Sequence, residues 1–123
     1  MHAEPTSDIP PSAAYDTEAL ADLGDLFGPT RLHELLASLD AEIAARIGRI
    51  EAAAGGGDWK RLGEHAHALV SAGGSLGFLA LSGACARLEE ACLSGRADAS
   101  GVDAVMSDAA AARRAIATLR GGA

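Results

Sequence analysis

Apolar residues recur at helical spacing in five segments of the chain, and short stretches of Gly, Pro, Ser or Asp separate these segments. Intervals of three and four residues place apolar side chains on one face of a helix, and no segment shows the alternation that is typical of a strand. The pattern therefore predicts an all-α protein. The predicted helices span about residues 17–27, 30–55, 59–75, 78–93 and 101–119.

Residues that break or cap helices set the limits of these segments. Gly28 and Pro29 end the first helix because Pro cannot continue it, and the glycines at 55–57 end the second. Asp58 supplies a side chain that caps the third helix, and Gly77 permits a tight reversal after it. The last four helices have similar lengths and short connections. We therefore predict an antiparallel up-down-up-down four-helix bundle, with a short additional N-terminal helix laid across one end.

Residues 1–14 differ from the rest of the chain. They contain Pro5, Pro10 and Pro11 and show no apolar periodicity. This composition is typical of a flexible arm. We expect the folded domain to span residues 15–120, which is enough chain for a single core.

The composition excludes several classes of function. The chain has 123 residues, with 10 Lys and Arg against 17 Asp and Glu, and its net charge of −7 repels the phosphate backbone of a nucleic acid. Hydrophobic residues make up 49% of the chain but aromatic residues only 3%, which favours closely packed helices rich in Ala. No run of about 18 uncharged apolar residues and no basic, apolar leader is present. We expect a cytoplasmic protein with no nucleic-acid or membrane partner.

The sequence offers no convincing metal, nucleotide or cofactor site. Cys85 and Cys92 are predicted on one helix about 10 Å apart, too far for a disulfide, so we expect two buried free thiols without a shared metal. His65 and His67 point about 200° apart on a helix, so one ion cannot bind both. No Gly-x-x-x-x-Gly-Lys loop is present, so we expect no ATP site and no autokinase activity.

His67 is the candidate functional residue. On a helical wheel the third helix buries one stripe, formed by Leu62, Ala66, Leu69 and Gly73. His67 lies roughly 140° from this stripe and is predicted to face solvent, whereas His65 lies roughly 60° from it, at the edge of the buried face. We therefore interpret His65 as a packing or hydrogen-bonding residue. The predicted neighbours of His67 on the helix surface are Lys60, Gly63, Glu64, Val70, Ser71 and Gly74.

This predicted surface has the character of a docking site. Gly63, Ser71 and Gly74 keep it low, although a helical glycine costs about 0.5–1 kcal/mol relative to Ala. Val70 adds apolar area of the kind that a partner protein covers. An unperturbed imidazole is largely neutral near pH 7, with a nucleophilic nitrogen whose phosphoryl form is reactive enough to be passed on. These features favour group transfer to and from another protein at His67.

Residues 67–77 resemble the histidine-containing phosphotransfer (HPt) domain family, and residues 58–62, Ala66, Leu81, Cys85, Leu88 and Glu89 look like its flanking pattern. The resemblance implies a four-helix bundle in which His67 is the phosphoacceptor. His67 would accept a phosphoryl group from the phosphoaspartate of a receiver domain and pass it to another receiver. The partners implied are response-regulator receiver domains and a hybrid sensor histidine kinase, with Mg²⁺ on the receiver and no cofactor on this chain.

Two positions depart from the family pattern. Many members have Lys three residues after the histidine and Gly four residues after it, whereas this chain has Val70 and Ser71. The charge of a phosphohistidine must then be balanced from elsewhere, and Lys60 and Arg61 are the nearest candidates on the helix. Two alternatives remain open: a receiver-binding module of the same fold that is not phosphorylated, and a plain helical-bundle scaffold.

Overall fold

The computed structural model describes residues 14–121, and this part of the chain contains five α-helices and no strand. The all-α prediction is confirmed, and the helix ends agree with the predicted ends to within about two residues. The arm predicted over residues 1–14 lies outside the described residues except for Ala14, whose side chain is buried. The helices are α1 (Thr17–Phe27), α2 (Pro29–Gly55), α3 (Trp59–Ser75), α4 (Leu79–Leu93) and α5 (Ala99–Leu119).

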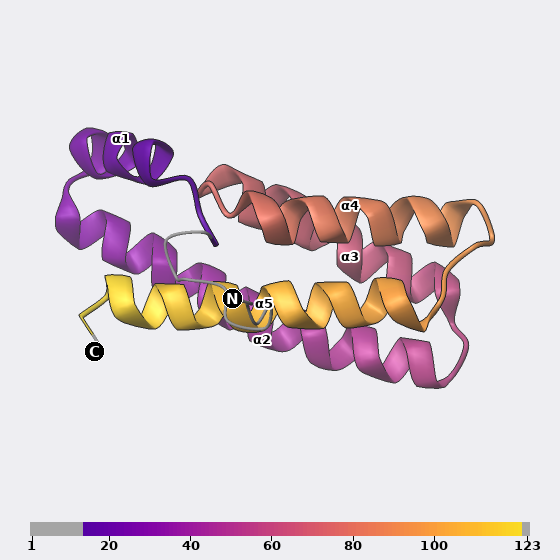
Figure 1. The fold of residues 1–123 in the computed structure, drawn as a ribbon. Helices are drawn as coiled ribbons and strands as arrows, with labels where there is room; N and C mark the ends of the chain where they lie inside the picture. Colours follow the sequence, from indigo (N-terminus) through magenta and orange to yellow (C-terminus); the bar gives the residue numbers. More distant parts are fainter. Residues whose placement is uncertain (1–13, 122–123) are drawn as a thin grey trace, which may run out of the picture.

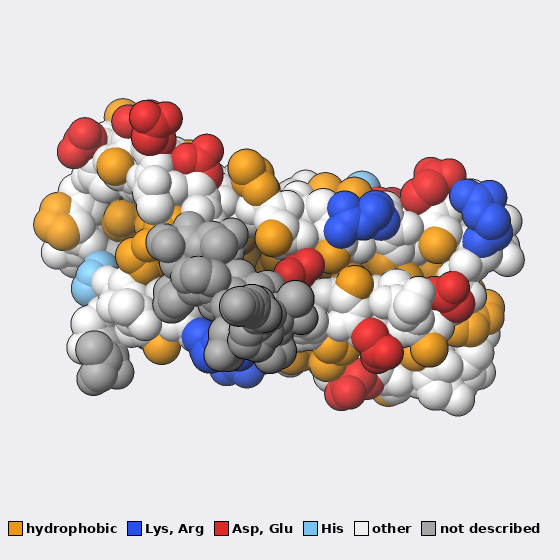
Figure 2. Space-filling model, viewed as in Figure 1, with side chains coloured by type: hydrophobic (Ala, Val, Ile, Leu, Met, Phe, Trp, Pro, Cys, Tyr) orange, Lys and Arg blue, Asp and Glu red, His pale blue; other side chains and the backbone are white. Residues whose placement is uncertain are grey.

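Four of the helices form an elongated bundle (Figure 1). Each of α2, α3 and α4 packs against the helix that follows it in the chain, and α5 packs against α2, which closes the ring. The shorter α1 lies at one end of the bundle, beside the start of α2 (Figure 1). Figure 2 shows acidic side chains gathered on the exposed face of α1. The predicted four-helix bundle with an extra N-terminal helix is confirmed.

Aspartate side chains cap the N-termini of three helices. Oδ1 of Asp58 accepts a hydrogen bond from the backbone N–H of Arg61 at 3.1 Å, as the sequence predicted for α3. Asp16 caps α1 in the same way. Asp98 caps α5 by accepting from the N–H of Gly101, and this cap explains why α5 begins two residues before its predicted start.

A single apolar core fills the bundle. Phe78 is fully buried at the turn between α3 and α4, where the ring of Tyr15 packs on it with 5.6 Å between ring centroids. Among residues 14–121 no polar or charged residue is buried. The inward face predicted for α3 is confirmed, since its four members are all buried: Leu62, Ala66, Leu69 and Gly73.

The turn between α3 and α4 fixes how these two helices face each other. Gly77 has φ +82°, a left-handed conformation that favours glycine. Its carbonyl accepts a hydrogen bond from the backbone N–H of Asp16 at 2.8 Å, which ties the start of α1 to the turn. A side chain at Gly77 would also approach Cβ of Ala19 to 3.3 Å. The turn is therefore tightly packed, and α3 and α4 run antiparallel from it.

Within the described residues, none of the helices combines the length and apolar character needed to cross a bilayer.

Candidate functional site

His67 lies in the middle of α3 and points away from the core. Its side chain is 68% exposed, which confirms the predicted outward direction. Nδ1 of the ring lies 2.8 Å from Oε2 of Glu89, a residue of α4 whose side chain is only 28% exposed. One edge of the imidazole is thus held by a carboxylate of the neighbouring helix, and the rest of the ring is open to solvent.

The antiparallel register of α3 and α4 brings this pair together. Residues at nearly equal distances along the chain from the Gly77 turn face each other across the two helices. Near the far end of the pair a Cβ at Gly63 would lie 3.2 Å from Cβ of Cys92, and close to the turn a Cβ at Gly74 would lie 3.3 Å from Oγ of Ser82. His67 faces Glu89 between these two contacts.

A groove of about 570 Å³ runs between α3 and α4 beside His67. At its outer end the exposed apolar side chains of Trp59 and Leu93 flank it. An open groove that combines an apolar end with a nucleophilic side chain suits contact with a protein surface. Its lining residues are Trp59, Lys60, Gly63, Glu64, His67, Glu89, Cys92 and Leu93.

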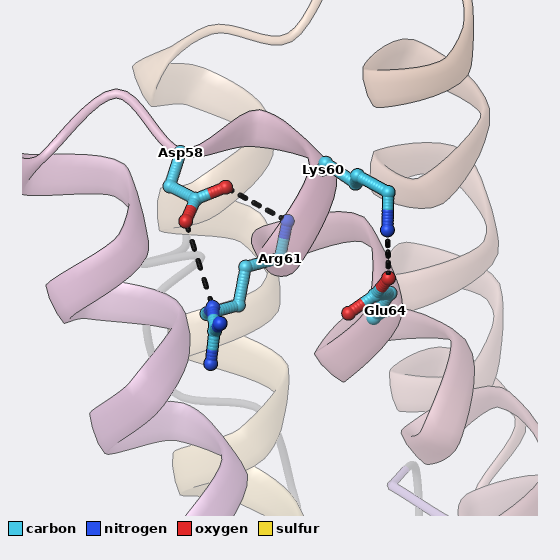
Figure 3. A network of polar contacts seen from close by, with 4 residues as sticks. All are labelled: Asp58, Lys60, Arg61 and Glu64. Carbon is cyan, nitrogen blue, oxygen red and sulfur yellow. Dashed lines mark hydrogen bonds and ion pairs between the residues drawn. The ribbon is translucent and has the colours of Figure 1, made fainter.

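The charged side chains at the start of α3 form two separate ion pairs (Figure 3). Nζ of Lys60 lies 2.7 Å from Oε2 of Glu64. This hydrogen bond and the opposite charges raise the pKa of Lys60 and lower the pKa of Glu64. On another side of α3, Nε of Arg61 lies 3.5 Å from Oδ2 of Asp58. Lys60 therefore belongs to the His67 groove, and Arg61 does not.

The six predicted neighbours of His67 lie on two sides of it along α3. Lys60, Gly63 and Glu64 line the groove with His67. The other three lie nearer the α3–α4 turn, beyond the groove: Val70 is half-buried and its carbonyl accepts a hydrogen bond from Oγ of Ser82 at 2.8 Å, Ser71 is exposed, and Gly74 is half-buried.

The structure gives a different reason for two of the glycines on this face. From the sequence alone, Gly63 and Gly74 are expected to make room for a partner protein. Gly63 is instead buried, and any side chain there would meet Cβ of Cys92. Gly74 leaves room for Ser82, which reaches across to the backbone of α3. Both glycines permit close packing of α3 on α4, and this packing brings Glu89 to His67.

His65 faces α2, away from the groove, and confirms its prediction as a packing and hydrogen-bonding residue. Nη1 of Arg46 donates a hydrogen bond to Nδ1 of His65 at 2.8 Å, and Nε of the same guanidinium donates to Glu42. Burial lowers the pKa of His65, and the nearby positive charges of Arg46 and Arg49 lower it further. His65 is therefore a neutral hydrogen-bond acceptor near pH 7.

The two cysteines are free thiols in different environments. Cys85 is buried in the core, and burial raises the pKa of its thiol to about 12. Cys92 is half-buried and lines the groove, so the expectation that both thiols are buried is wrong for Cys92. Within residues 14–121 no group of three or more His, Cys, Asp or Glu side chains is arranged to hold a metal ion.

Four residues of the groove were not among the candidates drawn from the sequence: Trp59, Glu89, Cys92 and Leu93. Three of them belong to α4, and periodicity within one helix does not reveal which residues of the next helix face it. A signal was nevertheless present, because the tight turn at Gly77 sets the register of α3 against α4. Counting outward from that turn gives positions opposite His67 and Gly63 that lie within two residues of Glu89 and Cys92.

Comparison with known proteins agrees with this geometry. The crystal structure of histidine-containing phosphotransfer protein B (HptB) from Pseudomonas aeruginosa PAO1 superimposes with a TM-score of 0.82 at 22% sequence identity, covering 89% of this chain and 96% of that one. The chain matches no curated protein sequence. The family model of the Hpt domain matches residues 34–122, which include all of α3 and α4 with His67 and Glu89. Since this match spans most of the sequence, the chain belongs to the Hpt domain family.

Proposed function

We propose that His67 accepts a phosphoryl group from the aspartyl phosphate of one receiver domain and passes it to the aspartate of another, in a multistep phosphorelay that a hybrid sensor histidine kinase feeds. The observation that carries this proposal is the exposed imidazole held at Nδ1 by Glu89, within the region that matches the Hpt family. Histidine phosphotransfer in phosphorelays is the role of this family.

Glu89 prepares the ring for this reaction. A carboxylate 2.8 Å from Nδ1 favours the tautomer that carries its proton on Nδ1, which leaves the lone pair on Nε2. Nε2 then attacks phosphorus in line, the bond from phosphorus to the aspartyl oxygen breaks, and the aspartate leaves as a carboxylate. The ring gains a positive charge that faces Glu89. No proton has to leave the ring, so the same arrangement serves the reverse step to the next receiver.

The chain supplies the nucleophile and its orientation. Mg²⁺ bound to the receiver supplies the charge stabilisation at the transferring phosphoryl group. The chain therefore acts as a phosphocarrier without an ATP site or a cofactor of its own. Two free thiols fit a cytoplasmic protein, because the reducing cytoplasm keeps thiols from forming disulfides.

The receiver would dock over the His67 groove. Trp59 and Leu93 offer exposed apolar area at its outer end, and Lys60 and Glu64 offer charges between them and His67. On the other side of His67, the predicted contact surface continues along α3 through Val70, Ser71 and Gly74. Hpt domains interact with the receiver domains of response regulators, and this face presents the nucleophile of the chain.

Transfer from a radiolabelled, phosphorylated receiver domain tests the proposal. Each receiver of the host is incubated with the wild-type chain, with His67→Gln and with His33→Gln, which removes another exposed histidine that lies on α2. We expect an acid-labile, alkali-stable label on the wild type and on His33→Gln and none on His67→Gln, with helical circular dichroism unchanged. Label retained by folded His67→Gln overturns the assignment.

A second candidate function is receiver binding without phosphoryl transfer. It is favoured by Val70, which stands where many family members have Lys, and by the ion pair that already occupies Lys60. Receiver binding by the wild-type chain without any labelling in the same experiment would support this alternative.

A further inference from the structure

The groove beside His67 holds more negative than positive charge. Its charged residues are Lys60, Glu64 and Glu89, so Lys60 is the one cation among the described residues that line it. Glu64 already neutralises Lys60 at 2.7 Å. Transfer to Nε2 would bring in three strong acceptor oxygens with a charge of roughly −1.5 to −2, while the ring gains one positive charge that faces Glu89. Without a rearrangement, the phosphoryl oxygens would be repelled by the carboxylate of Glu64.

The position of Lys60 allows such a rearrangement. Lys60 precedes His67 by two helical turns, about 10 Å along the axis, on the same side of α3. Its ammonium group reaches Glu64, which is only one turn from His67, so the ammonium already extends toward the imidazole. Side chains of a helix lean toward its N-terminus, so the ring of His67 leans back toward the turn that carries Glu64.

Arg61, the other candidate cation, is directed elsewhere. Its guanidinium pairs with Asp58 and lines a separate hollow together with Arg49 and His65. Figure 3 shows Arg61 on a different side of α3 from Lys60. The choice between Lys60 and Arg61, which the sequence left open, therefore falls on Lys60.

The ion pair that holds Lys60 is weak enough to exchange. The side chains of Lys60 and Glu64 are 86% and 61% exposed, and exposed pairs one turn apart contribute little to stability because water screens them. A phosphoryl group carries more charge than a carboxylate and offers more acceptors, so it competes well for an ammonium group.

We propose that Lys60 is the counter-ion of phosphorylated His67 and that Glu64 competes with the phosphoryl group for it, so that this pair sets how phosphoryl groups are distributed between the chain and its receiver. This inference rests on the proposed function. Lys60 lowers the free energy of the phosphorylated chain, and Glu64 opposes it, which keeps the phosphoryl group easy to pass on.

The equilibrium constant for phosphoryl exchange between the chain and a receiver tests this inference. At equilibrium the distribution depends only on the free energies of the separate proteins, so a residue that acts only in docking changes the rates and leaves the distribution unaltered. A receiver that labels the wild-type chain is brought to equilibrium with each variant, and the labelled fraction of each protein is measured. Unfolding curves confirm that the variants are folded.

We expect Lys60→Gln to shift the distribution toward the receiver by roughly two- to fivefold and Glu64→Gln to shift it toward the chain by a similar factor. Lys60→Arg keeps the positive charge, so its distribution should stay close to that of the wild type. Arg61→Gln and Glu34→Gln are matched controls, because each breaks an exposed ion pair of α3 or α2 outside the groove, and both should leave the distribution unchanged.

The role of Lys60 is overturned if Lys60→Gln leaves the distribution unchanged, or if Arg61→Gln shifts it equally. Labelling of His67 would still support the proposed function in either case. A distribution that Glu64→Gln leaves unchanged overturns the competition. If no receiver labels the wild-type chain, the proposed function fails and this inference fails with it.

Discussion

Nδ1 of His67 and Oε2 of Glu89 lie 2.8 Å apart, so the exposed imidazole of α3 is held by a half-buried carboxylate of α4. The contact depends on the close approach of the two helices at Gly63 and Gly74. The proposed nucleophile of this Hpt domain is therefore oriented by the packing of a helix pair, and the site depends on residues that one helix alone does not contain.

Removal of the Glu89 carboxylate should change the tautomer of His67. In Glu89→Ala we expect a mixture of the two neutral tautomers and a rate of transfer to His67 that is lower by roughly tenfold, since a hydrogen-bond partner of a charged group is lost. Glu89→Gln keeps an acceptor oxygen, so its transfer rate should fall by less. Nitrogen NMR shifts of the ring report the tautomer, and they should move in Glu89→Ala but not in Glu90→Ala, which alters the next residue of α4.

Gly63 should resist substitution more than a glycine without neighbours. Alanine in a helix is favoured over glycine by about 0.5–1 kcal/mol, and Gly48→Ala should gain this stability because nothing lies within 4 Å of the new Cβ. Gly63→Ala should leave the free energy of unfolding unchanged or lower it. Its Cβ would lie 3.2 Å from Cβ of Cys92, so α4 would have to move. Urea unfolding measures both, and an equal gain at the two positions would refute the close packing.

The two thiols should react at different rates in the folded protein. Burial raises the pKa of Cys85 to about 12 and leaves almost no thiolate near pH 8. Burial also raises the pKa of Cys92, but this thiol is only half-buried and is open to the groove. Iodoacetamide should therefore modify Cys92 first and Cys85 only after unfolding, which mass spectrometry resolves. Equal rates at the two cysteines would contradict the structure.

Modification of Cys92 should also slow phosphoryl transfer to His67, because the added group occupies the groove. The control is Cys92→Ser, which removes the reactive thiol. Treatment of that variant with iodoacetamide should leave its transfer rate unchanged.

His65 should make the fold less stable in mild acid. Its pKa is lower in the folded protein than the ordinary value of 6.5, because of burial and the charges of Arg46 and Arg49. As the pH falls through 6.5 the unfolded chain takes up this proton before the folded chain does, so the free energy of unfolding decreases until the pH is below the folded-state value. His65→Asn keeps an acceptor but does not titrate. Between about pH 7.5 and pH 5.5 it should lose less stability than the wild type, and an equal loss would exclude His65 as the cause.

Periodicity predicted most of the fold and the outward direction of His67. The stripe that begins at Leu62 defines the core side of α3, and His67 lies well away from it, so its exposure follows from one helix alone. The start of α5 was predicted late because the Asp98 cap is a local hydrogen bond outside the apolar pattern. Helix limits and faces are thus readable from the sequence where they depend on neighbours in the chain.

The environment of His67 was less predictable, because it depends on the register between helices. Glu89 and Cys92 reach the groove through the Gly77 turn and the packing of α3 on α4, and a pattern within α3 carries no information on either. The same limitation led to the interpretation of Gly63 as a partner-facing residue, although α4 covers it. Whether a glycine on a helix surface faces solvent or another helix is decided by tertiary packing.

The proposed phosphocarrier role requires the outward imidazole of His67 to carry the phosphoryl group on Nε2. Correlation of ³¹P with ¹⁵N in the isotope-labelled chain, after transfer from a phosphorylated receiver, tests it most directly. We predict one phosphorus resonance coupled to Nε2 of His67, with Nδ1 still protonated beside Glu89. A phosphoryl group on another residue, or on Nδ1 of His67, would refute this assignment.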